Sequence, residues 1–485
     1  MNEKSDSKWL SLATVSILGQ PPNNTSLPHA FLTFLSGAFP SKDILTAPED
    51  CWVYGYDNSQ IHALPQAVVF PTEQSQVLTT IQACNQFIIP LTVRGRGTGT
   101  TGATTPLKGG LVMSMERMTK VLNFSPDNRY ITVEPGLSNQ QVQEQVITKG
   151  LFWPPDPSSA AFCTVGGNLA FNSAGPKAVK YGTPRENVLG LRAITGAGKE
   201  IKTGVFTTKG VVGYDLTRLL IGSEGTLAII TEATLKLTSL AAAKITLQAF
   251  YRSIDDAARA ISSIMNLAIT PCALEFIDGN AIALIRHNSN INIPESAQAL
   301  LMIEVDGPEQ GLAYAAAQVS TAANNAGLIY IKSAATDAET ESLWKTRKAL
   351  APTLRKAAAK RINEDVVVPV TEIPKLIQGL DKLSKKHQIP IINFGHAGNG
   401  NIHVNLLLSA DDSQQNKRAK HCLDDVFSLV LELNGTLSGE HGVGIAKRDY
   451  IDRELDANSL ELMRNIKKQF DPNGILNPDK IFPIS

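Results

Sequence analysis

The sequence has few of the features that mark secreted, membrane-spanning or nucleic-acid-binding proteins. Its five cysteines are odd in number and show no Cys-x-x-Cys spacing, which argues against a disulfide framework and a cysteine-bound metal. It has no uninterrupted apolar run of about 18 residues and no apolar segment of a secretory signal. Lys plus Arg and Asp plus Glu number 45 each, so nucleic acid is not an expected partner. We expect a cytoplasmic protein and leave open a peripheral contact with a membrane.

The 485 residues are 43% hydrophobic and 19% charged, which is typical of a globular protein with two or three domains. In the first part, hydrophobic periodicity predicts strands separated by helices, one of which begins after Thr72 as its N-cap. Near residue 240 the pattern changes to strands that alternate with alanine-rich helices. This change predicts a second sheet with helices on one side, including one unbroken helix over residues 338–356.

Glycine and threonine alternate over residues 90–110, PLTVRGRGTGTTGATTPLKGG, with Arg94 and Arg96 at the entrance. Glycine lets the backbone approach a ligand closely, and threonine hydroxyls and successive N–H groups can donate to an anion. We therefore predict a phosphate-binding loop between two strands. It is not a P-loop, since no Gly-Lys-Ser/Thr follows, and it lacks the dinucleotide fingerprint with an acidic residue about 20 positions further on. Taken alone, the composition also suits an ordinary flexible loop.

A second stretch suited to close backbone contact is found at residues 154–175, PPDPSSAAFCTVGGNLAFNSAG. With it, four motifs resemble the FAD-binding half of the vanillyl-alcohol-oxidase fold: Arg94-Gly-Arg-Gly-Thr-Gly, Pro154-Pro-Asp-Pro-Ser-Ser, Thr164-Val-Gly-Gly-Asn and Ile221-Gly-Ser-Glu-Gly-Thr-Leu. The likeness covers residues 50–485 and points to one family within this fold. It is greatest to the flavin-dependent D-2-hydroxy-acid dehydrogenases, which include D-lactate dehydrogenases, D-2-hydroxyglutarate dehydrogenases and the flavin subunit of glycolate oxidase.

The resemblance implies an α+β fold with a two-part FAD-binding domain and an α+β substrate (cap) domain built on an antiparallel sheet. We expect an N-terminal extension over residues 1–50, the FAD-binding domain over 51–240 and the cap domain with a metal site over 241–440. Residues 441–485 are expected to return to the FAD-binding domain.

The resemblance also implies which residues bind FAD. They are Arg94, Gly95, Gly97, Thr98, Gly99, Thr101, Gly102, Pro155, Asp156, Ser158, Gly166, Gly167, Asn168, Ser173, Gly225, Ile230 and Asn477. Covalent members of the fold often carry a histidine where Thr98 stands, and the loop contains no histidine or cysteine. We therefore expect FAD to be bound without a covalent link.

Two histidines lie in residues 391–406, IINFGHAGNGNIHVNL, which predicts two strands joined by a Gly/Asn turn. If His396 and His403 were directly paired across this hairpin, their Cβ atoms would be about 5 Å apart. Further on, Glu440 and His441 stand between glycines. Two imidazoles and a carboxylate are a plausible ligand set for Zn²⁺. The alternatives are that the histidines are ordinary core residues and that Glu440 and His441 are a capping pair.

In the resembling family, the two histidines and the glutamate bind a divalent metal, and the next histidine is the proposed base. The resemblance thus implies His396, His403 and Glu440 as metal ligands and His441 as the base. Arg347 resembles the arginine that binds the substrate carboxylate, and a guanidinium suits that role because it can donate two parallel hydrogen bonds. The alternative is that Arg347 is an ordinary charged residue on a helix surface, exposed to solvent.

The substrate implied by this reading is a small D-2-hydroxy acid, which FAD would oxidise to the 2-oxo acid. Where D-2-hydroxyglutarate dehydrogenases place a lysine for the distal carboxylate, this sequence has Ile362-Asn-Glu. D-lactate or glycolate is therefore favoured over a dicarboxylate. The electron acceptor stays open among a quinone, a cytochrome and an electron-transfer flavoprotein, and a homodimer is one option for the assembly.

Two functions from other classes are the alternatives. The first is an FAD-dependent transferase without net redox chemistry, of the ether-lipid synthase type. The second is a flavin-carrying subunit of a larger oxidase complex without an active site of its own. A subunit of that kind would not need both the histidine pair and Glu440-His441, so the complete set of motifs argues against it.

Overall fold

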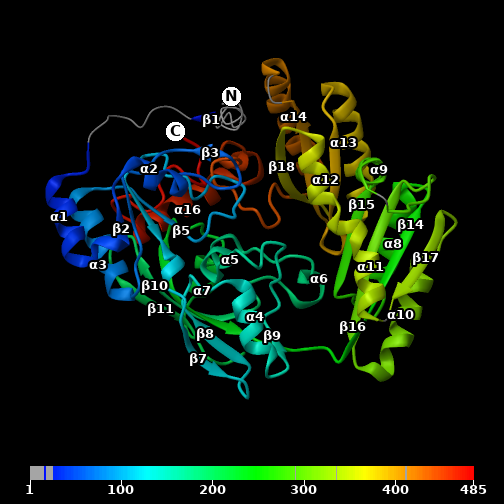
Figure 1. Cartoon of the computed structure of the whole chain (residues 1–485), viewed down its shortest axis with the longest axis horizontal. Helices are drawn as coiled ribbons and strands as arrows, with labels where there is room; N and C mark the ends of the chain where they lie inside the picture. Colours follow the sequence, from blue (N-terminus) through cyan, green and yellow to red (C-terminus); the bar gives the residue numbers. More distant parts are fainter. Residues whose placement is uncertain (1–15, 18–25, 290, 335, 410–411, 485) are drawn as a thin grey trace, which may run out of the picture. The chain divides into compact units, whose positions relative to one another are not determined.

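The computed structural model describes residues 16–17, 26–289, 291–334, 336–409 and 412–484 (Figure 1), and the chain forms two compact units. The central unit consists of residues 175–181 and 241–439 among those described. The N-terminal unit consists of the described residues of 15–174, 182–240 and 440–485. The C-terminal segment therefore belongs to the unit that the first part of the chain builds.

One sheet of the N-terminal unit has four strands in the order β2-β4-β6-β5. Its members are β2 (Ile44–Leu45), β4 (Ala67–Val69), β5 (Leu91–Arg94) and β6 (Leu111–Ser114). The pairs β4–β6 and β5–β6 are parallel, and β2 is antiparallel to β4. Helices α1 (His29–Ala38) and α3 (Gln74–Phe87) pack on it through Phe31, Leu35 and Ile81. Part of the expected N-terminal extension over residues 1–50 thus contributes to this sheet and its core, and its residues 1–15 and 18–25 lie outside the described residues.

The second sheet of this unit is antiparallel, with the order β11-β10-β12-β8-β7. Its strands are β7 (Val121–Ser125), β8 (Tyr130–Val133), β10 (Val188–Thr195), β11 (Glu200–Gly204) and β12 (Ala228–Lys236). The helices α4 (Asn139–Ile147), α5 (Val165–Phe171) and α7 (Leu216–Leu220) contribute to its core. Ser138 and Gln141 form a capping box at the start of α4, the local signal that makes this helix begin there.

The remaining strands and α-helices described in the N-terminal unit are short, apart from one helix near the C-terminus. They are β1 (Ser16–Ile17), α2 (Pro48–Cys51), β3 (Ile61–His62), β9 (Leu151–Phe152), β13 (Thr238–Ser239), α15 (Ile451–Glu454) and α16 (Ala457–Phe470). After α16, Leu476 forms a parallel bridge with Leu91 of β5. This bridge attaches the C-terminal segment to the strand that enters the glycine-rich loop.

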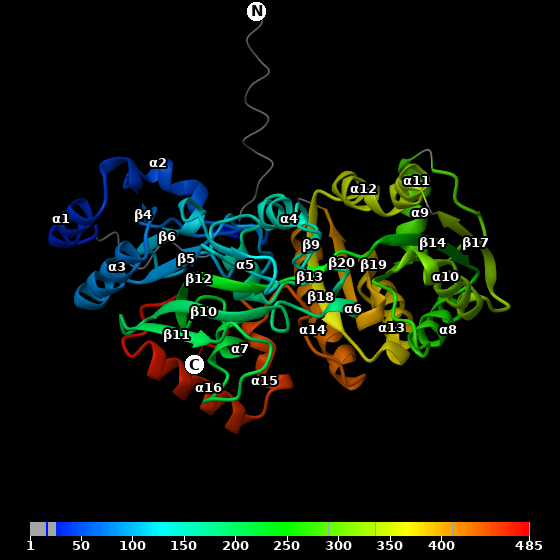
Figure 2. The ribbon, with the colours of Figure 1, turned by 90° about the horizontal axis from the view of Figure 1, so that it is seen from below.

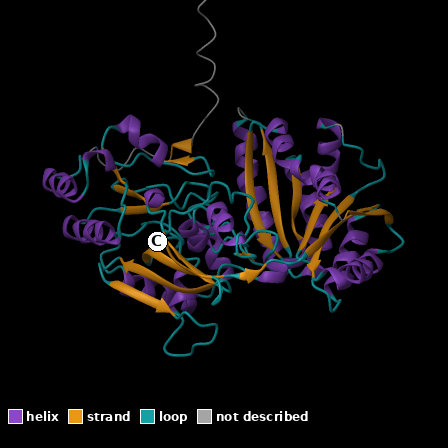
Figure 3. Cartoon of the chain, turned by 60° about the horizontal axis from the view of Figure 1, so that its bottom comes forward, coloured by secondary structure: helices purple, strands orange, loops and turns teal. Residues whose placement is uncertain are grey.

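The central unit is built on a seven-stranded antiparallel sheet with the order β17-β14-β16-β15-β19-β20-β18. Its strands are β14 (Ala243–Tyr251), β15 (Ala273–Asp278), β16 (Ala299–Gly307), β17 (Leu328–Ala334), β18 (Lys360–Val367), β19 (Ile391–His396) and β20 (Asn401–Leu408). Figure 3 shows these strands as one continuous sheet between helices. The predicted antiparallel sheet of the cap domain is confirmed.

Helices cover both faces of this sheet, so the expectation of helices on one side is wrong. Figure 2 shows α9 (Gly279–Asn288), α11 (Asp337–Lys348) and α12 (Leu350–Ala357) on one face, and α8 (Ile254–Met265), α10 (Glu309–Ala323), α13 (Ile373–His387) and α14 (Ser413–Glu432) on the other. A short helix, α6 (Ala178–Tyr181), also belongs to this unit. All residues of β16 from 299 to 305 are buried, as a strand covered on both faces requires.

Two predicted helix limits are corrected. Thr72 does not cap α3, which starts at Gln74 after Glu73; the backbone N–H of Thr72 instead donates to the Gln76 side chain. The helix expected over residues 338–356 is two helices, α11 and α12, which meet at Ala349. Pro352 has no N–H to continue the hydrogen-bond ladder of α11, but proline is tolerated in the first turn of a new helix.

The five cysteines all lie within the described residues and are free and buried. Across those same residues, the structure contains no helix with both the length and the apolar character needed to span a bilayer.

Candidate functional site

The glycine-rich loop connects β5 to β6, as predicted, and is closely packed. Gly97 has a φ of +66°, which L-residues rarely adopt, and a Cβ there would stand 2.2 Å from Arg94 Nη2. A Cβ at Gly95 would stand 2.3 Å from Thr164 Oγ1. Thr164 is the N-cap of α5 and accepts from Gly167 N. The first and second predicted loops therefore lie against each other.

The fourth motif, residues 221–227, and the C-terminal segment lie against the same loops. A Cβ at Gly225 would lie 2.5 Å from Val93 Cγ1 on β5. Asn477 Nδ2 donates to Ala103 O at 2.9 Å and to Glu224 O at 2.8 Å. The N-terminal unit thus brings together four segments that are far apart in the sequence.

Several buried polar atoms beside these loops have no hydrogen-bond partner within the described ranges. They include Arg94 Nε, Thr100 Oγ1 and Thr104 Oγ1, together with two acceptor oxygens, Asp57 Oδ2 and Asn477 Oδ1. A buried polar atom without a partner costs roughly 1–3 kcal/mol, so their grouping around a close-packed glycine loop indicates that a polar ligand belongs there. Hydroxyls, a guanidinium and successive backbone amides are donors to phosphate oxygens. The residues present fit the diphosphate group of FAD.

The other predicted FAD-binding residues have different surroundings. Thr98 O and Gly99 O accept hydrogen bonds from Asn58, and Pro155 O and Asn168 Oδ1 accept from Asn139 Nδ2. Asp156 N donates to Ala174 O, and Gly166 packs on Pro135. Ser158 is exposed, and Ile230 lies in the apolar core. Asn58 and Asn139 were not predicted. They support the loops through three backbone carbonyls and the Asn168 side chain, a role that leaves no signal in a single sequence.

The backbone around Glu440 and His441 is held by two of the predicted cofactor-loop residues. Thr101 Oγ1 donates to His441 O at 3.3 Å, and Ser173 Oγ donates to Glu440 O at 3.1 Å. Thr101 O in turn accepts from Ile445 N at 2.8 Å. The acid–histidine pair is therefore placed by loops of the N-terminal unit.

Glu224 holds the next residues of the same segment and was not predicted to have this role. Its two carboxylate oxygens accept from Val443 N at 2.6 Å and from Gly444 N at 2.8 Å. Burial raises the pKa of Glu224 from 4.5 to about 7, although the two amides and the nearby Lys447 and Lys480 favour the carboxylate. Glu224 is part of the Gly-Ser-Glu-Gly motif, so the sequence marked its position as part of a cofactor loop. The sequence did not indicate which backbone groups it contacts.

The histidine pair lies in the central unit on the hairpin of β19 and β20, in a register that differs from the direct pairing considered above. His396 lies opposite Asn401, and His403 lies opposite Phe394. The two histidines are therefore diagonal neighbours on one face of the sheet. Their ring centroids are nevertheless 5.2 Å apart, with the ring planes at 84°. The turn needs Gly400, whose φ is +73°.

Glu440 directly follows Gly439, the last residue of the central unit, and a buried acid of β18 fixes that residue. Asp365 Oδ2 accepts from Gly439 N at 2.8 Å, and its other oxygen accepts from Ser438 Oγ at 3.3 Å. Asp365 is fully buried and lies opposite His403 in the sheet. One carboxylate thus holds the backbone immediately before Glu440.

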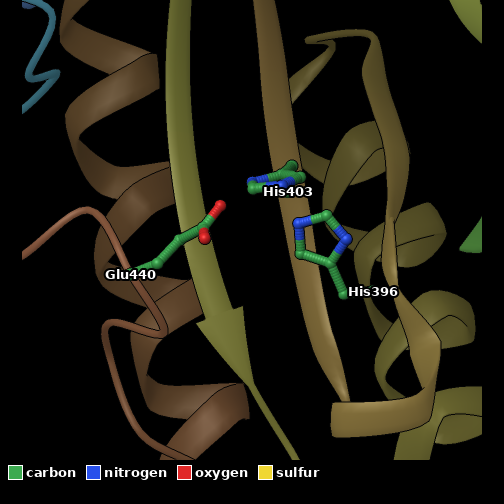
Figure 4. Close-up of side chains that lie close together, drawn as sticks. All are labelled: His396, His403 and Glu440. Carbon is green, nitrogen blue, oxygen red and sulfur yellow. The ribbon is translucent and has the colours of Figure 1, made fainter. Parts of the chain in front are cut away.

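The side chains of His396, His403 and Glu440 converge, as Figure 4 shows. One potential ligand atom from each lies within 4.8 Å of the others. Both histidines are buried, and Glu440 is half-buried. Two imidazole nitrogens and one carboxylate oxygen are a ligand set that suits Zn²⁺ and similar divalent ions. The residues present fit such an ion, and His441 is not part of this group of three.

Arg347 lies on α11 with only 20% of its side chain exposed. Its guanidinium stacks on the Phe394 ring, 4.8 Å from the centroid, and Nε donates to Glu275 Oε2 at 3.2 Å. It is therefore a positioned group and not a solvated helix charge. Phe394 also contacts the His403 ring, at 5.5 Å between centroids.

Glu275, on β15, is the residue of this region that the sequence did not reveal. Its Oε1 makes a short hydrogen bond with His396 Nδ1 while Oε2 accepts from Arg347. Burial alone would raise the pKa of Glu275, but the charges and hydrogen bonds of His396 and Arg347 hold it below its ordinary value. The only signal was an acid within a strand whose residues are otherwise mostly apolar, ALEFID.

Comparison with known families agrees with this arrangement. Residues 65–204 match the FAD binding domain family, and residues 240–481 match the family of FAD linked oxidases, C-terminal domain. The chain belongs to the FAD-linked oxidase family.

Relatives of this FAD-linked oxidase cover nearly its whole length. It is 37% identical over 431 residues to the glycolate oxidase subunit GlcD of Bacillus subtilis (strain 168), which covers 89% of this chain and 92% of that protein. It is 31% identical over 450 residues to the D-lactate dehydrogenase of Anaerostipes hadrus, with 91% and 94% covered. The resemblance to the flavin-dependent 2-hydroxy-acid dehydrogenases is confirmed, and the protein is an oxidoreductase.

Solved structures show the same fold at low sequence identity. A 4-ethylphenol oxidase from Gulosibacter chungangensis has a TM-score of 0.77 and 18% identity, covering 96% of this chain and 99% of that one. An alkyldihydroxyacetonephosphate synthase has a TM-score of 0.75 and 18% identity, covering 95% and 86%. The predicted fold class is confirmed, and at this identity the likeness extends to the fold alone.

Glu224 generates a testable pH dependence of stability. Its folded pKa of about 7 exceeds the ordinary 4.5, so the folded chain binds this proton more tightly than the unfolded chain. Its contribution to the free energy of unfolding is therefore present below pH 4.5 and is lost as the pH rises through 7, by roughly 3 kcal/mol in total.

Chemical unfolding of the wild type and of Glu224→Gln, measured at several pH values from 4.5 to 8, tests this expectation. The stability of the wild type should fall relative to the variant over this range, because glutamine does not titrate. Parallel stability curves for the two proteins would contradict it.

Proposed function

We propose that this oxidoreductase converts a small D-2-hydroxy acid, of the D-lactate or glycolate type, to the 2-oxo acid. The observation that carries the proposal is the carboxylate of Glu275, which joins Arg347 to His396. It places a group suited to binding a substrate carboxylate beside a group suited to binding a metal. The proposal is also supported by the names of the relatives, a glycolate oxidase subunit and a D-lactate dehydrogenase.

Two non-protein groups are part of the proposal. The glycine-rich loop and the segments packed against it would hold FAD, while His396, His403 and Glu440 would hold a divalent ion, with Zn²⁺ as the first candidate. Bound FAD supplies the acceptor for a hydride, and a bound ion supplies positive charge beside the substrate hydroxyl.

The chain's own residues orient the substrate and remove its proton. Arg347 uses Nε for Glu275, which leaves its two terminal nitrogens to pair with the substrate carboxylate. His441 takes the proton of the substrate hydroxyl as general base. With one hydride leaving C2 and one proton leaving oxygen, the hydroxyl becomes a carbonyl.

Two alternatives remain distinguishable by experiment. A transferase of the ether-lipid synthase type would reduce no dye with any 2-hydroxy acid. A flavin-carrying subunit would turn over only with its partners present, and the relative from Bacillus subtilis is itself named as a subunit. The purified chain alone, tested with small hydroxy acids and a dye acceptor, decides among the three.

The substrate preference is expected to be for D-configured monocarboxylic acids. Arg347 would bind one carboxylate of the substrate, and the ion held by His396, His403 and Glu440 would bind the neighbouring hydroxyl. We therefore expect kcat/KM for D-lactate or glycolate to exceed that for D-2-hydroxyglutarate and for L-lactate. Steady-state kinetics with these four acids measures the order, and a clear preference for the dicarboxylate or for the L form would overturn it.

FAD is expected to leave the protein when the chain is unfolded. Thr98 stands where covalent members of the fold often carry a histidine, and residues 90–110 contain no histidine or cysteine. Acid precipitation should leave the flavin in the supernatant, where absorbance quantifies it. A yellow pellet that survives washing in denaturant would contradict this expectation.

Glu440 and His441 are expected to have separate roles. Glu440→Ala should lose the ion and all turnover, because it removes one of three ligands. His441→Ala should keep the ion and the flavin while turnover falls roughly 10²- to 10⁴-fold, the usual contribution of a general base. Metal analysis beside kinetics measures both effects.

The matched control is His421→Ala, which removes an exposed histidine of α14 and should change neither metal content nor turnover. Equal metal loss in the Glu440 and His441 variants would make His441 a ligand. Full metal retention in Glu440→Ala would remove Glu440 from the ligand set.

A further inference from the structure

Glu275 lies at the middle of the seven-stranded sheet. It is 2% exposed, and its strand, β15, pairs with β16 on one side and with β19 on the other. In the register with β19, Glu275 is directly opposite His396. Directly opposite residues of antiparallel strands have their side chains on the same face, so the contact between them follows from the sheet itself.

The two oxygens of Glu275 have two different partners. Oε1 bonds His396 Nδ1, and Oε2 accepts from Arg347 Nε at 3.2 Å. The Arg347 guanidinium is further restrained by stacking on Phe394. A buried carboxylate is costly unless donors satisfy it, and here one imidazole and one guanidinium do so.

This arrangement selects which nitrogen of His396 can bind an ion. A carboxylate accepts hydrogen bonds and cannot donate them, so Nδ1 must carry the hydrogen. Nε2 is then the nitrogen whose lone pair can bind a metal. Hydrogen bonds of this kind, from a ligating histidine to a carboxylate behind it, orient the ring and raise its basicity.

We propose that Glu275 is a positioning residue that couples the metal ligand His396 to the substrate-binding Arg347. The inference rests on the proposed function for the roles of those two residues. Through one oxygen Glu275 sets the hydrogen position and orientation of His396, and through the other it aims the guanidinium of Arg347. Metal affinity and substrate affinity thus depend on the same buried charge.

The variant Glu275→Gln separates this role from simple packing, because it keeps the shape and replaces one acceptor by a donor. If the amide oxygen faces Arg347, the NH₂ group faces His396 Nδ1, which moves the ring hydrogen to Nε2 and blocks ion binding. If the amide turns round, His396 is satisfied and the NH₂ group opposes Arg347 Nε–H. One of the two partners is therefore always lost.

The test titrates Zn²⁺ into the metal-free, FAD-loaded chain in competition with a chromophoric chelator. We expect the Zn²⁺ dissociation constant of Glu275→Gln to rise about 10- to 100-fold, the usual effect of removing such a partner. At saturating Zn²⁺ the amide must turn to suit His396. The kcat should then recover, while KM for the hydroxy acid stays elevated because Arg347 has lost its partner.

The matched control is Asp278→Asn on the same strand. Asp278 is also 2% exposed and holds the same neighbouring strand, since it accepts from Asn393 N at 3.0 Å and Nδ2 at 2.8 Å. Being three residues from Glu275, it faces the other side of the sheet. This variant should lower the melting temperature and leave Zn²⁺ affinity within about twofold of the wild type, because it loosens the strands without touching the ligands.

Wild-type Zn²⁺ affinity in Glu275→Gln, or equal loss in both variants, would overturn the proposal. If Glu275→Gln fails to fold, Glu275→Asp replaces it; the carboxylate is then one methylene short, and Zn²⁺ binding should again weaken relative to Asp278→Asn. The Zn²⁺ titration needs no substrate. A wild type that binds Zn²⁺ but oxidises no hydroxy acid would therefore reject the proposed function while the link between Glu275 and His396 still stands.

Discussion

A carboxylate buried in a protein must be surrounded by donors, because its desolvation otherwise costs several kcal/mol. In this chain three buried carboxylates meet that requirement by holding functional groups. Glu275 holds His396 and Arg347, Asp365 holds the backbone before Glu440, and Glu224 holds the backbone after His441. The proposed metal ligands His396 and Glu440, the proposed substrate group Arg347 and the proposed base His441 are therefore placed in part by three buried acids outside the proposed ligand set.

The sequence predicts the parts of this site that depend on local patterns. A glycine at a positive φ, such as Gly97, is required by the loop that contains it. The hairpin of His396 and His403 was likewise visible, because its two strands and its turn are contiguous. Each of these features can be read without knowing what lies beside it in space.

The features that sequence reading missed depend on partners far away in the chain. Glu275 and His396 meet only because β15 pairs with β19 in one register, and a register is not encoded near either residue. The diagonal placement of the two histidines has a different origin, because the length of the turn between β19 and β20 sets the register of their hairpin. By contrast, the covering of both sheet faces had a local signal, since the seven buried residues ALLMIEV of β16 leave no polar face for solvent.

The carboxylate of Glu275, which contacts both His396 and Arg347, also links the proposed metal binding to the proposed substrate binding. Glu275 is tolerated in the sheet because two donors, Arg347 and His396, offset the cost of burying its charge. If Arg347 is replaced, His396 is the one of these two donors that still contacts the carboxylate. A change at the substrate group should then alter the environment of the metal ligand, and the effects of substitutions at the two positions should not add. If the proposed roles hold, substrate affinity and metal affinity are linked properties, because one buried acid in the centre of the sheet contacts both proposed groups.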